Sequence, residues 1–348
     1  MARSRTGTKL AADFARVMAG MPWPGAVAVS GGGDSLALMH LLADWARRTR
    51  RPPPLVLTVD HGLRPGSAAV ARNVARRARA AGLRCEILTA AGPAPEADIE
   101  AWARDTRLAL MGERLGRRGL SALYVAHSRD DQAETFLMRL ARGSGLDGLA
   151  AMRPLAPFPL PGFEGLSLVR PLLGIGRAAL REDLSARGQG WLEDPMNADP
   201  RFLRVRIRAL LPQLEAAGLP VARIADAAAH LARAREALDL ATAAVLSRAL
   251  KADGQGILLD AAALAAAPRE IGLRALAAVL GRVSGAAYRP RFESLERLYD
   301  RILAGKLGGG ATLQGCRIGP APARKRVFGP PTLSVIPESS PRRAAKRN

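Results

Sequence analysis

Residues 26–35 read Ala-Val-Ala-Val-Ser-Gly-Gly-Gly-Asp-Ser, and this stretch decides the fold of the first part of the chain. Four small apolar residues predict a short buried strand, and the apolar run after the glycines predicts a helix packed on a sheet. A strand, a glycine-rich turn and a helix N-terminus form an anion site, because backbone N–H groups and the helix dipole both favour a phosphate there. Ser30 and Ser35 add hydroxyl donors, and Asp34 is a candidate Mg²⁺ ligand.

This loop differs from two common phosphate-binding loops. A Walker A loop needs a lysine before its final Ser or Thr, and the chain has no lysine between Ala26 and Arg47. The dinucleotide turn Gly-x-Gly-x-x-Gly is excluded because Leu36 stands where its last glycine belongs. An ordinary tight βα turn stays open as an interpretation, although it does not require three glycines, two serines and a carboxylate.

Composition limits the class of protein. The chain has 348 residues, which is enough for two domains, and its net charge of +21 predicts a polyanionic partner, with nucleic acid first and an anionic membrane surface second. Two distant cysteines, Cys85 and Cys316, exclude a disulfide framework and a paired-cysteine zinc site. No apolar run reaches about 18 residues, and Asp13 and Arg16 interrupt any signal-peptide core near the N-terminus. We therefore expect a cytoplasmic protein without a membrane partner, and the sequence indicates no obligatory protein partner.

Predicted strands alternate with predicted helices in the first part of the chain. The strands are 26–29, 55–59, 85–88 and 122–126, and the helices are 7–20, 35–48, 67–81 and 98–115. This alternation predicts an α/β fold, a Rossmann-like parallel sheet with helices on both faces. The anion loop and the polar residues that follow the strands at 59 and 126 should then share the edge where such sheets bind ligands.

The remaining chain is predicted from composition and spacing. Residues 143–171 are rich in Gly and Pro and predict a loop, followed by helices at 176–187 and 221–251 and a smaller, mainly helical or α/β unit at 256–318. We expect a nucleotide-binding domain at 1–215, a C-terminal domain at 216–319 and a basic, disordered tail at 320–348. Helical spacing of the apolar residues at 203–214 leaves four arginines on the other faces, Arg201, Arg204, Arg206 and Arg208.

Three acidic residues open a predicted helix, and their spacing places Asp130, Asp131 and Glu134 on one face. One interpretation is helix capping, because Ser128 and Asp131 have the spacing of a capping box. The other interpretation is functional: acids beside a phosphate loop can hold Mg²⁺ or receive a cationic substrate such as an amine. The sequence leaves both open.

Two histidines and two arginines are further candidates. His61 and His127 each follow a strand, where a neutral imidazole can hydrogen-bond a nucleotide or act as a base, although a lone histidine is often structural. Arg104 and Arg107 belong to a predicted helix, as part of a solvated basic face or as a clamp on a triphosphate.

The motifs together resemble a known family. Residues 30–35 resemble the PP-loop of the N-type ATP pyrophosphatases, which cleave ATP to AMP and pyrophosphate while adenylating a substrate. The chain is further similar to the tRNA(Ile)-lysidine synthase family in Val59-Asp-His-Gly-Leu-Arg64, Glu100-x-x-Ala-Arg104, Ala126-His-Ser-Arg-Asp-Asp-Gln-Ala-Glu-Thr135, Arg139-Leu-Ala-Arg-Gly-Ser-Gly145 and Asp194-Pro-x-Asn197. The resemblance covers roughly residues 25–215, and the motif at 126–145 is highly specific.

The resemblance implies a ligation reaction on RNA. ATP adenylates O2 of the wobble cytidine in a tRNA(Ile) with the anticodon CAU, and the ε-amine of free L-lysine then attacks C2. AMP leaves, lysidine remains, and the tRNA reads AUA instead of AUG. The implied partners are this tRNA and free L-lysine, with ATP as a substrate and Mg²⁺ as a cofactor.

The resemblance also implies roles for individual residues. The phosphates of ATP would be held by Ser30, Gly31, Gly32, Gly33, Asp34 and Ser35, and Asp34 would also bind Mg²⁺. The nucleotide pocket would be lined by Val59, Asp60, His61 and His127. Arg104 would contact ATP or the adenylated intermediate, and Asp131 and Glu134 would bind the lysine amine or assist proton removal. The tRNA contacts would include Arg201, Arg204, Arg206 and Arg208.

The chain departs from the family pattern at three positions. None of these substitutions removes a phosphate-binding residue or a carboxylate. Ser128 stands where a second histidine is common, Val205 where an asparagine is common, and Leu108 where an aromatic residue often follows the arginine.

Three other functions remain to be weighed. A PP-loop tRNA thiolase needs catalytic cysteines or an iron–sulfur cluster, for which Cys85 and Cys316 form no suitable pair. A small-molecule adenylating amidotransferase does not account for the charge of +21 or for the arginines at 201–208. A non-catalytic tRNA-binding protein does not account for the intact loop at 30–35.

Overall fold

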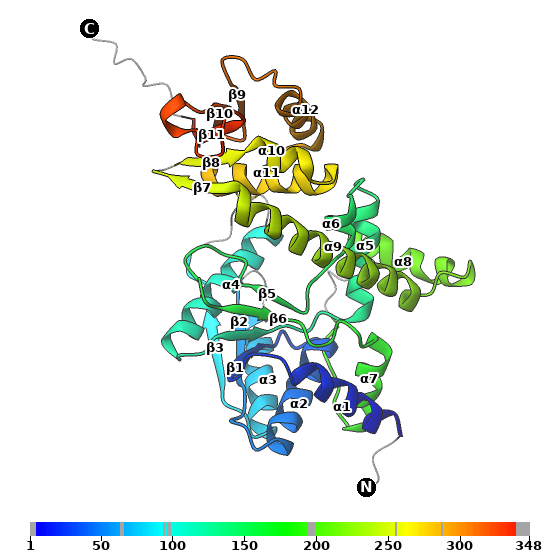
Figure 1. Ribbon diagram of the computed structural model, residues 1–348. Helices are drawn as coiled ribbons and strands as arrows, with labels where there is room; N and C mark the ends of the chain where they lie inside the picture. The colour runs from blue at the N-terminus through cyan, green and yellow to red at the C-terminus, as the bar shows by residue number, and fades with distance from the viewer. Residues whose placement is uncertain are drawn as a thin grey trace. The chain divides into compact units, whose positions relative to one another are not determined.

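The computed structural model describes residues 5–62, 66–92, 95, 99–193, 199–254, 256–286 and 288–338. The chain forms two compact units, residues 1–232 and 233–348 (Figure 1). The boundary falls inside helix α9 (Val221–Ala249), and not at the predicted position after residue 215. This helix has 29 residues without a glycine or proline, so no loop or composition change marks the boundary in the sequence.

A six-stranded sheet forms the centre of the first unit. Its order is β3-β2-β1-β4-β6-β5, with all neighbours parallel except β5 and β6. The strands are β1 (Gly25–Ala28), β2 (Leu55–Asp60), β3 (Cys85–Thr89), β4 (Ala122–Tyr124), β5 (Leu155–Pro157) and β6 (Ser167–Val169). The parallel α/β prediction is confirmed. The loop predicted at 143–171 is wrong where β5 and β6 occur, because three-residue strands between glycines and prolines have too little pattern to be recognised.

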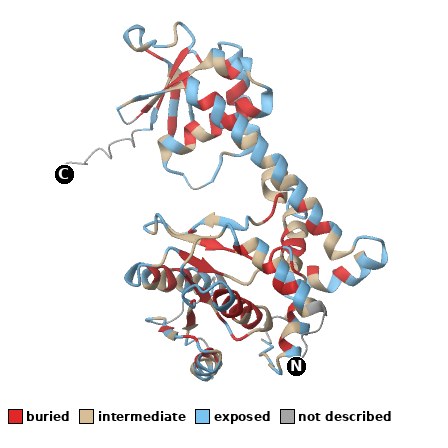
Figure 2. Cartoon of the chain, turned by 60° about the horizontal axis from the view of Figure 1, so that its bottom comes forward, coloured by how far each residue is buried: buried red, intermediate tan, exposed pale blue. Residues whose placement is uncertain are grey.

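Helices cover both faces of this sheet. They are α1 (Arg5–Met18), α2 (Gly33–Arg48), α3 (Ser67–Ala80), α4 (Ile99–Arg117), α5 (Arg129–Leu140), the short α6 (Leu146–Leu149), α7 (Arg177–Ala186) and α8 (Leu203–Ala216). Successive strand residues point to opposite faces. Accordingly, Val27 packs with α1, α2, α3 and α7, whereas Ala26 packs with α4. Two separate apolar cores therefore hold the sheet, and the buried strands and helix faces are visible in Figure 2.

Helix α2 is buried along most of its length, and this burial fixes the loop that precedes it. Leu36, Leu38, Met39 and Leu42 are at most 1 % exposed. Burying one such side chain contributes about 1.5–3 kcal/mol, so the helix is held firmly against the sheet. The N-terminus of α2 consequently has a fixed position at the carboxyl end of β1.

The second unit is smaller and combines helices with an antiparallel sheet. Its sheet has the order β7-β8-β11-β10-β9, with strands β7 (Leu250–Asp253), β8 (Gly256–Asp260), β9 (Ala311–Leu313), β10 (Cys316–Pro320) and β11 (Thr332–Pro337). Its helices are α10 (Ala261–Ala266), α11 (Arg269–Ser284) and α12 (Phe292–Leu303), with the 3₁₀ turn η2 (Ala323–Lys325). Helices α11 and α12 touch at Gly272, where an added Cβ would lie 2.1 Å from the Tyr299 hydroxyl, so only glycine fits.

The disordered tail predicted at 320–348 is wrong for residues up to 338. Strand β11 lies in the middle of the second sheet, between β8 and β10, and its residues Leu333 and Val335 are buried. The basic and proline-rich composition around η2 concealed a strand of six residues. Residues 339–348 lie outside the described part of the chain. No helix in the described ranges is long and apolar enough to cross a membrane.

Candidate active site

The loop after β1 closes on itself through its two serines. The Ser35 hydroxyl donates to the Gly32 carbonyl at 2.8 Å, and the Ser30 N–H donates to the Ser35 hydroxyl at 3.2 Å. Gly31 has φ +91°, a conformation that glycine adopts without strain. No described side chain caps α2, so the first N–H groups of the helix point to the loop without a capping partner. This arrangement can accept a phosphate, as the sequence predicted.

The segment that follows α7 braces the loop from the other side. The Leu192 N–H donates to the Gly31 carbonyl at 3.1 Å. The Trp191 ring lies so close to Gly33 that an added Cβ would be 3.3 Å from it. The motif predicted at 194–197 follows directly but lies outside the described residues. The first and third glycines of the loop are therefore required for separate structural reasons, a positive φ at Gly31 and the close approach of Trp191 at Gly33.

One guanidinium brings the predicted acidic residues together. Arg177, the first residue of α7, lies 3.2 Å from Asp34 of the loop, 3.2 Å from Asp131 and 3.3 Å from Glu134 of α5. Its backbone N–H also donates to Asp130 at 2.8 Å. The predicted convergence of the loop and the α5 acids at one sheet edge is therefore what the structure has.

Sequence reasoning missed Arg177, although a signal was present. A cation in the first turn of a helix is unfavourable for the helix dipole unless a carboxylate neutralises it. Arg177 follows Gly174-Ile-Gly176 at this unfavourable position, and carboxylates from two other helices neutralise it. A basic residue at a helix start can thus indicate an acidic site elsewhere in the chain.

Asp131 caps α5 with one carboxylate oxygen and faces the site with the other. One oxygen, Oδ2, accepts hydrogen bonds from the Ser128 N–H and hydroxyl, each at 2.8 Å, and completes a capping box. The other oxygen, Oδ1, faces Arg177. Burial raises the pKa of Asp131, but the Ser128 hydrogen bonds and Arg177 outweigh it and the pKa is lowered. For Asp34 burial prevails over Arg177, so its pKa is raised.

Glu134 is fully buried and anchors arginines. Arg208 donates to both of its oxygens, at 2.8 and 3.1 Å, and the Nε of Arg204 lies 3.6 Å away. Arg204 and Arg208 were predicted as tRNA contacts, and the structure places them beside this carboxylate. Arg201 pairs with Asp199, whereas Arg206 is exposed and pairs with no described residue.

The predicted nucleotide-pocket residues follow β2 and β4. Val59 and Asp60 end β2, and Asp60 accepts the Gly62 N–H at 3.1 Å. Burial, and next the charge of Arg107, lower the pKa of His61. Burial also lowers the pKa of His127 to about 4, although Asp131 opposes the shift. Both rings are therefore neutral at pH 7, and each has a buried Nδ1 without a hydrogen-bond partner among the described residues.

Arg104 lies on the exposed side of α4, within a group of cations. Burial, and next the charge of Arg104, lower the pKa of Arg170, which follows β6. The charge of Arg170 in turn acts on His127. No described carboxylate pairs with Arg104 or Arg170, so this group suits an anionic ligand. The side chain of Glu100 lies outside the described residues.

Comparison with known proteins identifies the family. The PP-loop domain family matches residues 21–214. The tRNA(Ile)-lysidine synthase of Methylobacterium nodulans is 41% identical over 95% of this chain and 96% of its own length. The chain belongs to the tRNA(Ile)-lysidine synthase family. The member from a Bradyrhizobium species is 41% identical over 86% of this chain and 90% of its own. The Ruegeria pomeroyi member is 44% identical over 76% of this chain, and that match spans 62% of the relative.

A solved structure shows the same fold. The U34-tRNA thiolase NcsA from Methanococcus maripaludis has a TM-score of 0.52 and 14% identity, and the match covers 67% of this chain and 78% of that one. This chain has two free cysteines, Cys85 in the first unit and Cys316 in the second. Burial raises the pKa of Cys85 to about 11, so its thiol is protonated and poorly reactive.

The departures of this chain from the lysidine synthase pattern have local explanations. Ser128 caps α5 and is fully buried, and its hydroxyl and N–H hold Asp131. Leu108 packs in the core beneath α4 with Met111 and Leu115. Val205 lies in the first turn of α8, between Arg204 and Arg206, and is partly buried.

Proposed function

We propose that this protein ligates free L-lysine to C2 of the wobble cytidine in CAU-anticodon tRNA(Ile), consuming ATP and releasing AMP and pyrophosphate. The observation that carries the proposal is the phosphate loop at 30–35 facing a cluster of carboxylates at the ligand edge of the sheet. Relatives that this chain matches over nearly their whole length are named tRNA(Ile)-lysidine synthase, and this similarity supports the same reaction here.

ATP binds with its phosphates at the loop. The glycine backbone, the free N–H groups of α2 and the hydroxyls of Ser30 and Ser35 supply donors for the phosphate oxygens. His61 and the neutral His127 offer hydrogen bonds to the nucleotide without adding charge. Arg104 and Arg170 face the negative charge that develops as pyrophosphate leaves.

Mg²⁺ fits the site through a single carboxylate. Asp34 keeps Oδ1 without a hydrogen bond to a described residue, while Oδ2 accepts from Arg177. Mg²⁺ in nucleotide sites is usually held by one or two carboxylates together with substrate phosphates, so one protein ligand is sufficient. At Asp34, Mg²⁺ would supply positive charge beside the phosphates.

The lysine amine goes to Asp131 in this proposal, and Glu134 has a supporting role. Both Glu134 oxygens already accept from arginines, and the residue is 0 % exposed, so it fixes Arg177 and Arg208. Asp131 is partly exposed, and only its Oδ1 faces the exchangeable partner Arg177. Arg177 holds this cationic place in the free enzyme, and the lysine ammonium competes for it.

The ion pairs of the arginines at 201–208 reduce the number of candidates for a tRNA contact. Of the four arginines at 201–208, Arg206 is the one that forms no ion pair with a described residue, and we assign it to an RNA phosphate. Because each neutralised phosphate adds to the salt dependence, tRNA binding should weaken steeply as salt rises.

The proposal is tested by following the nucleotide product. With α-labelled ATP, AMP should form only when the CAU tRNA is present, because the cytidine is the group that is adenylated. AMP formed with free lysine and no tRNA would instead indicate a small-molecule adenylating enzyme and would overturn the proposal.

A further inference from the structure

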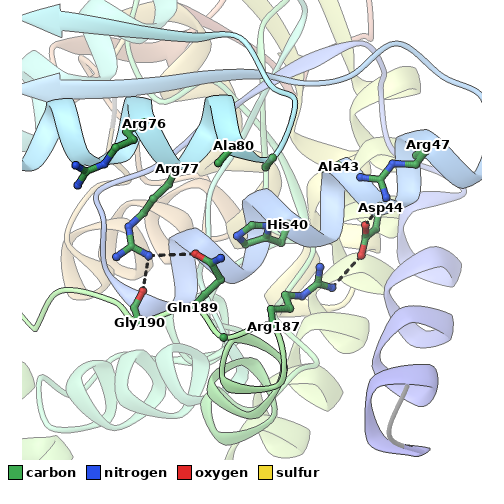
Figure 3. A pocket seen from close by; sticks show the side chains of 12 residues that line it. His40, Ala43, Asp44, Arg47, Arg76, Arg77, Ala80, Arg187, Gln189 and Gly190 are labelled. Carbon is green, nitrogen blue, oxygen red and sulfur yellow. Dashed lines mark hydrogen bonds and ion pairs between the residues drawn. The ribbon is translucent and has the colours of Figure 1, made fainter. Parts of the chain in front are cut away.

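A basic cavity lies in the first unit, apart from the active site. It has a volume of about 700 Å³ and opens between α2, α3 and the chain that follows α7 (Figure 3). Asp44, which lines it, follows Asp34 by ten residues on α2, and at 1.5 Å per residue the two lie about 15 Å apart along the helix. None of the residues assigned above to ATP, lysine or tRNA lines this cavity.

Cations outnumber carboxylates around the cavity. Four arginines line it, Arg47, Arg76, Arg77 and Arg187, against a single lining carboxylate. Asp44 already pairs with two of these arginines, Arg187 at 2.9 Å and Arg47 at 3.2 Å, and Asp183 of α7 pairs with Arg187 as well, at 2.7 Å. No charge on Asp44 is left over for the arginines of α3.

The two arginines of α3 have no carboxylate partner among the described residues. Arg77 donates to neutral oxygens, the Asn73 side chain at 2.7 Å, the Gln189 side chain at 3.2 Å and the Gly190 carbonyl at 2.7 Å. These bonds hold the guanidinium at the wall of the cavity without cancelling its charge. Arg76, the residue before Arg77, is exposed, and its side chain makes no hydrogen bond or ion pair with a described residue.

A histidine of α2 also lines the cavity. His40 lines the cavity, and its Nε2 is buried without a hydrogen-bond partner in the described chain. Burial and the charge of Arg187 lower the pKa of this ring, so it is neutral at pH 7 and carries one N–H. The donors around the cavity are thus guanidinium forks, which match the oxygens of a phosphate, and a neutral imidazole lies beside them.

We propose that this cavity binds a phosphate group. The phosphate of an RNA backbone and that of a free phosphorylated compound share this chemistry, and the chain's net charge of +21 favours either. The proposal does not rest on lysidine formation, because the cavity residues are separate from the phosphate loop.

Binding of inorganic pyrophosphate to the full chain tests the proposal by calorimetry. We compare R76Q/R77Q with R79Q/R84Q, which removes two exposed arginines at the end of α3 and just after it that do not line the cavity. Wild type and R79Q/R84Q should bind one more equivalent of pyrophosphate than R76Q/R77Q. Equal stoichiometry and affinity in all three proteins would overturn the proposal.

The double variant R76Q/R77Q could be destabilised, because Arg77 also hydrogen-bonds to residues 189–190. The single variant R76Q avoids this problem. R76Q removes no described contact, and it should weaken the cavity site at least fivefold while R79Q leaves it unchanged. The source of the phosphate follows from tRNA binding in the same proteins. A salt slope lowered by about two in R76Q/R77Q relative to R79Q/R84Q identifies an RNA backbone. Unchanged tRNA binding, with pyrophosphate binding lost, identifies a free phosphorylated compound.

Discussion

Replacing Arg177 by methionine removes the cation that three carboxylates share. Its side chain is 17% exposed, and Glu134 is 0% exposed, so the variant leaves charge uncompensated in a mostly buried place. Removing one partner of a buried ion pair costs about 3–5 kcal/mol of the free energy of unfolding. Because Arg177 is partly exposed, we expect a loss at the lower end, about 3 kcal/mol.

Tryptophan fluorescence during urea unfolding measures this loss in the relevant unit. All four tryptophans, Trp23, Trp45, Trp102 and Trp191, belong to the first unit, so the signal follows that unit. The midpoint should fall while the slope stays constant. The matched control is Arg181→Met, one turn further along α7, whose partner Glu193 is 69% exposed and whose loss should cost less than about 1 kcal/mol.

A double-mutant cycle with Glu134→Gln separates the ion pair from simple loss of packing. The double variant should be more stable than the sum of the two single losses predicts, by about 1–3 kcal/mol, because both members of the Arg177–Glu134 pair are then removed and neither leaves the other unpaired. Additive losses, or an Arg177→Met protein as stable as Arg181→Met, would refute the role of Arg177 as the neutralising centre of the site.

Three further predictions concern catalysis, RNA binding and pH. Asp34→Ala should abolish AMP formation from labelled ATP, because the loop loses the carboxylate that we propose as the Mg²⁺ ligand; normal turnover would contradict that assignment. Arg206→Ala should weaken tRNA binding and lower the salt slope by about one, with turnover at saturating tRNA unchanged, as filter binding would show; an unaltered slope argues for no phosphate contact. The folded pKa of His127 is about 4 against an unfolded value of 6.5, so the unfolded state takes up the proton first and stability falls as pH drops from 6.5 to 4. This contribution is about 3 kcal/mol, and urea unfolding of His127→Gln should show a correspondingly flatter pH profile; parallel profiles would contradict it.

The loop at 30–35 and the alternation of strands and helices made most of the first unit predictable. Short apolar strands and amphipathic helices carry their period in the local sequence, which is why β1 to β4 and the helices between them fall close to the predicted ranges. Strands β5 and β6 have three residues each and depend on pairing with β4 for their existence. Strand β11 likewise exists because β8 and β10 flank it. Such pairings are long-range and leave little trace in the local pattern.

The sequence predicted that the acidic side chains lie beside the loop, but not which arginines pair with them. Motif spacing selected Asp34, Asp131 and Glu134, and the topology brought them together. The roles of Arg204 and Arg208 could not be read from spacing, because a helical face shows which side chains are neighbours and not which distant carboxylate they meet. Arg177 was missed for the same reason, since all of its carboxylate partners come from helices far away in the sequence.

The central claim is tested most directly by incorporation of radiolabelled lysine into purified tRNAs, with ATP and Mg²⁺ and with each component omitted in turn. The account predicts label in tRNA(Ile) with the CAU anticodon, dependent on ATP, and no label in other tRNAs. AMP released on addition of this tRNA, without label in any tRNA, would contradict it and would mean that another nucleophile attacks the adenylated base.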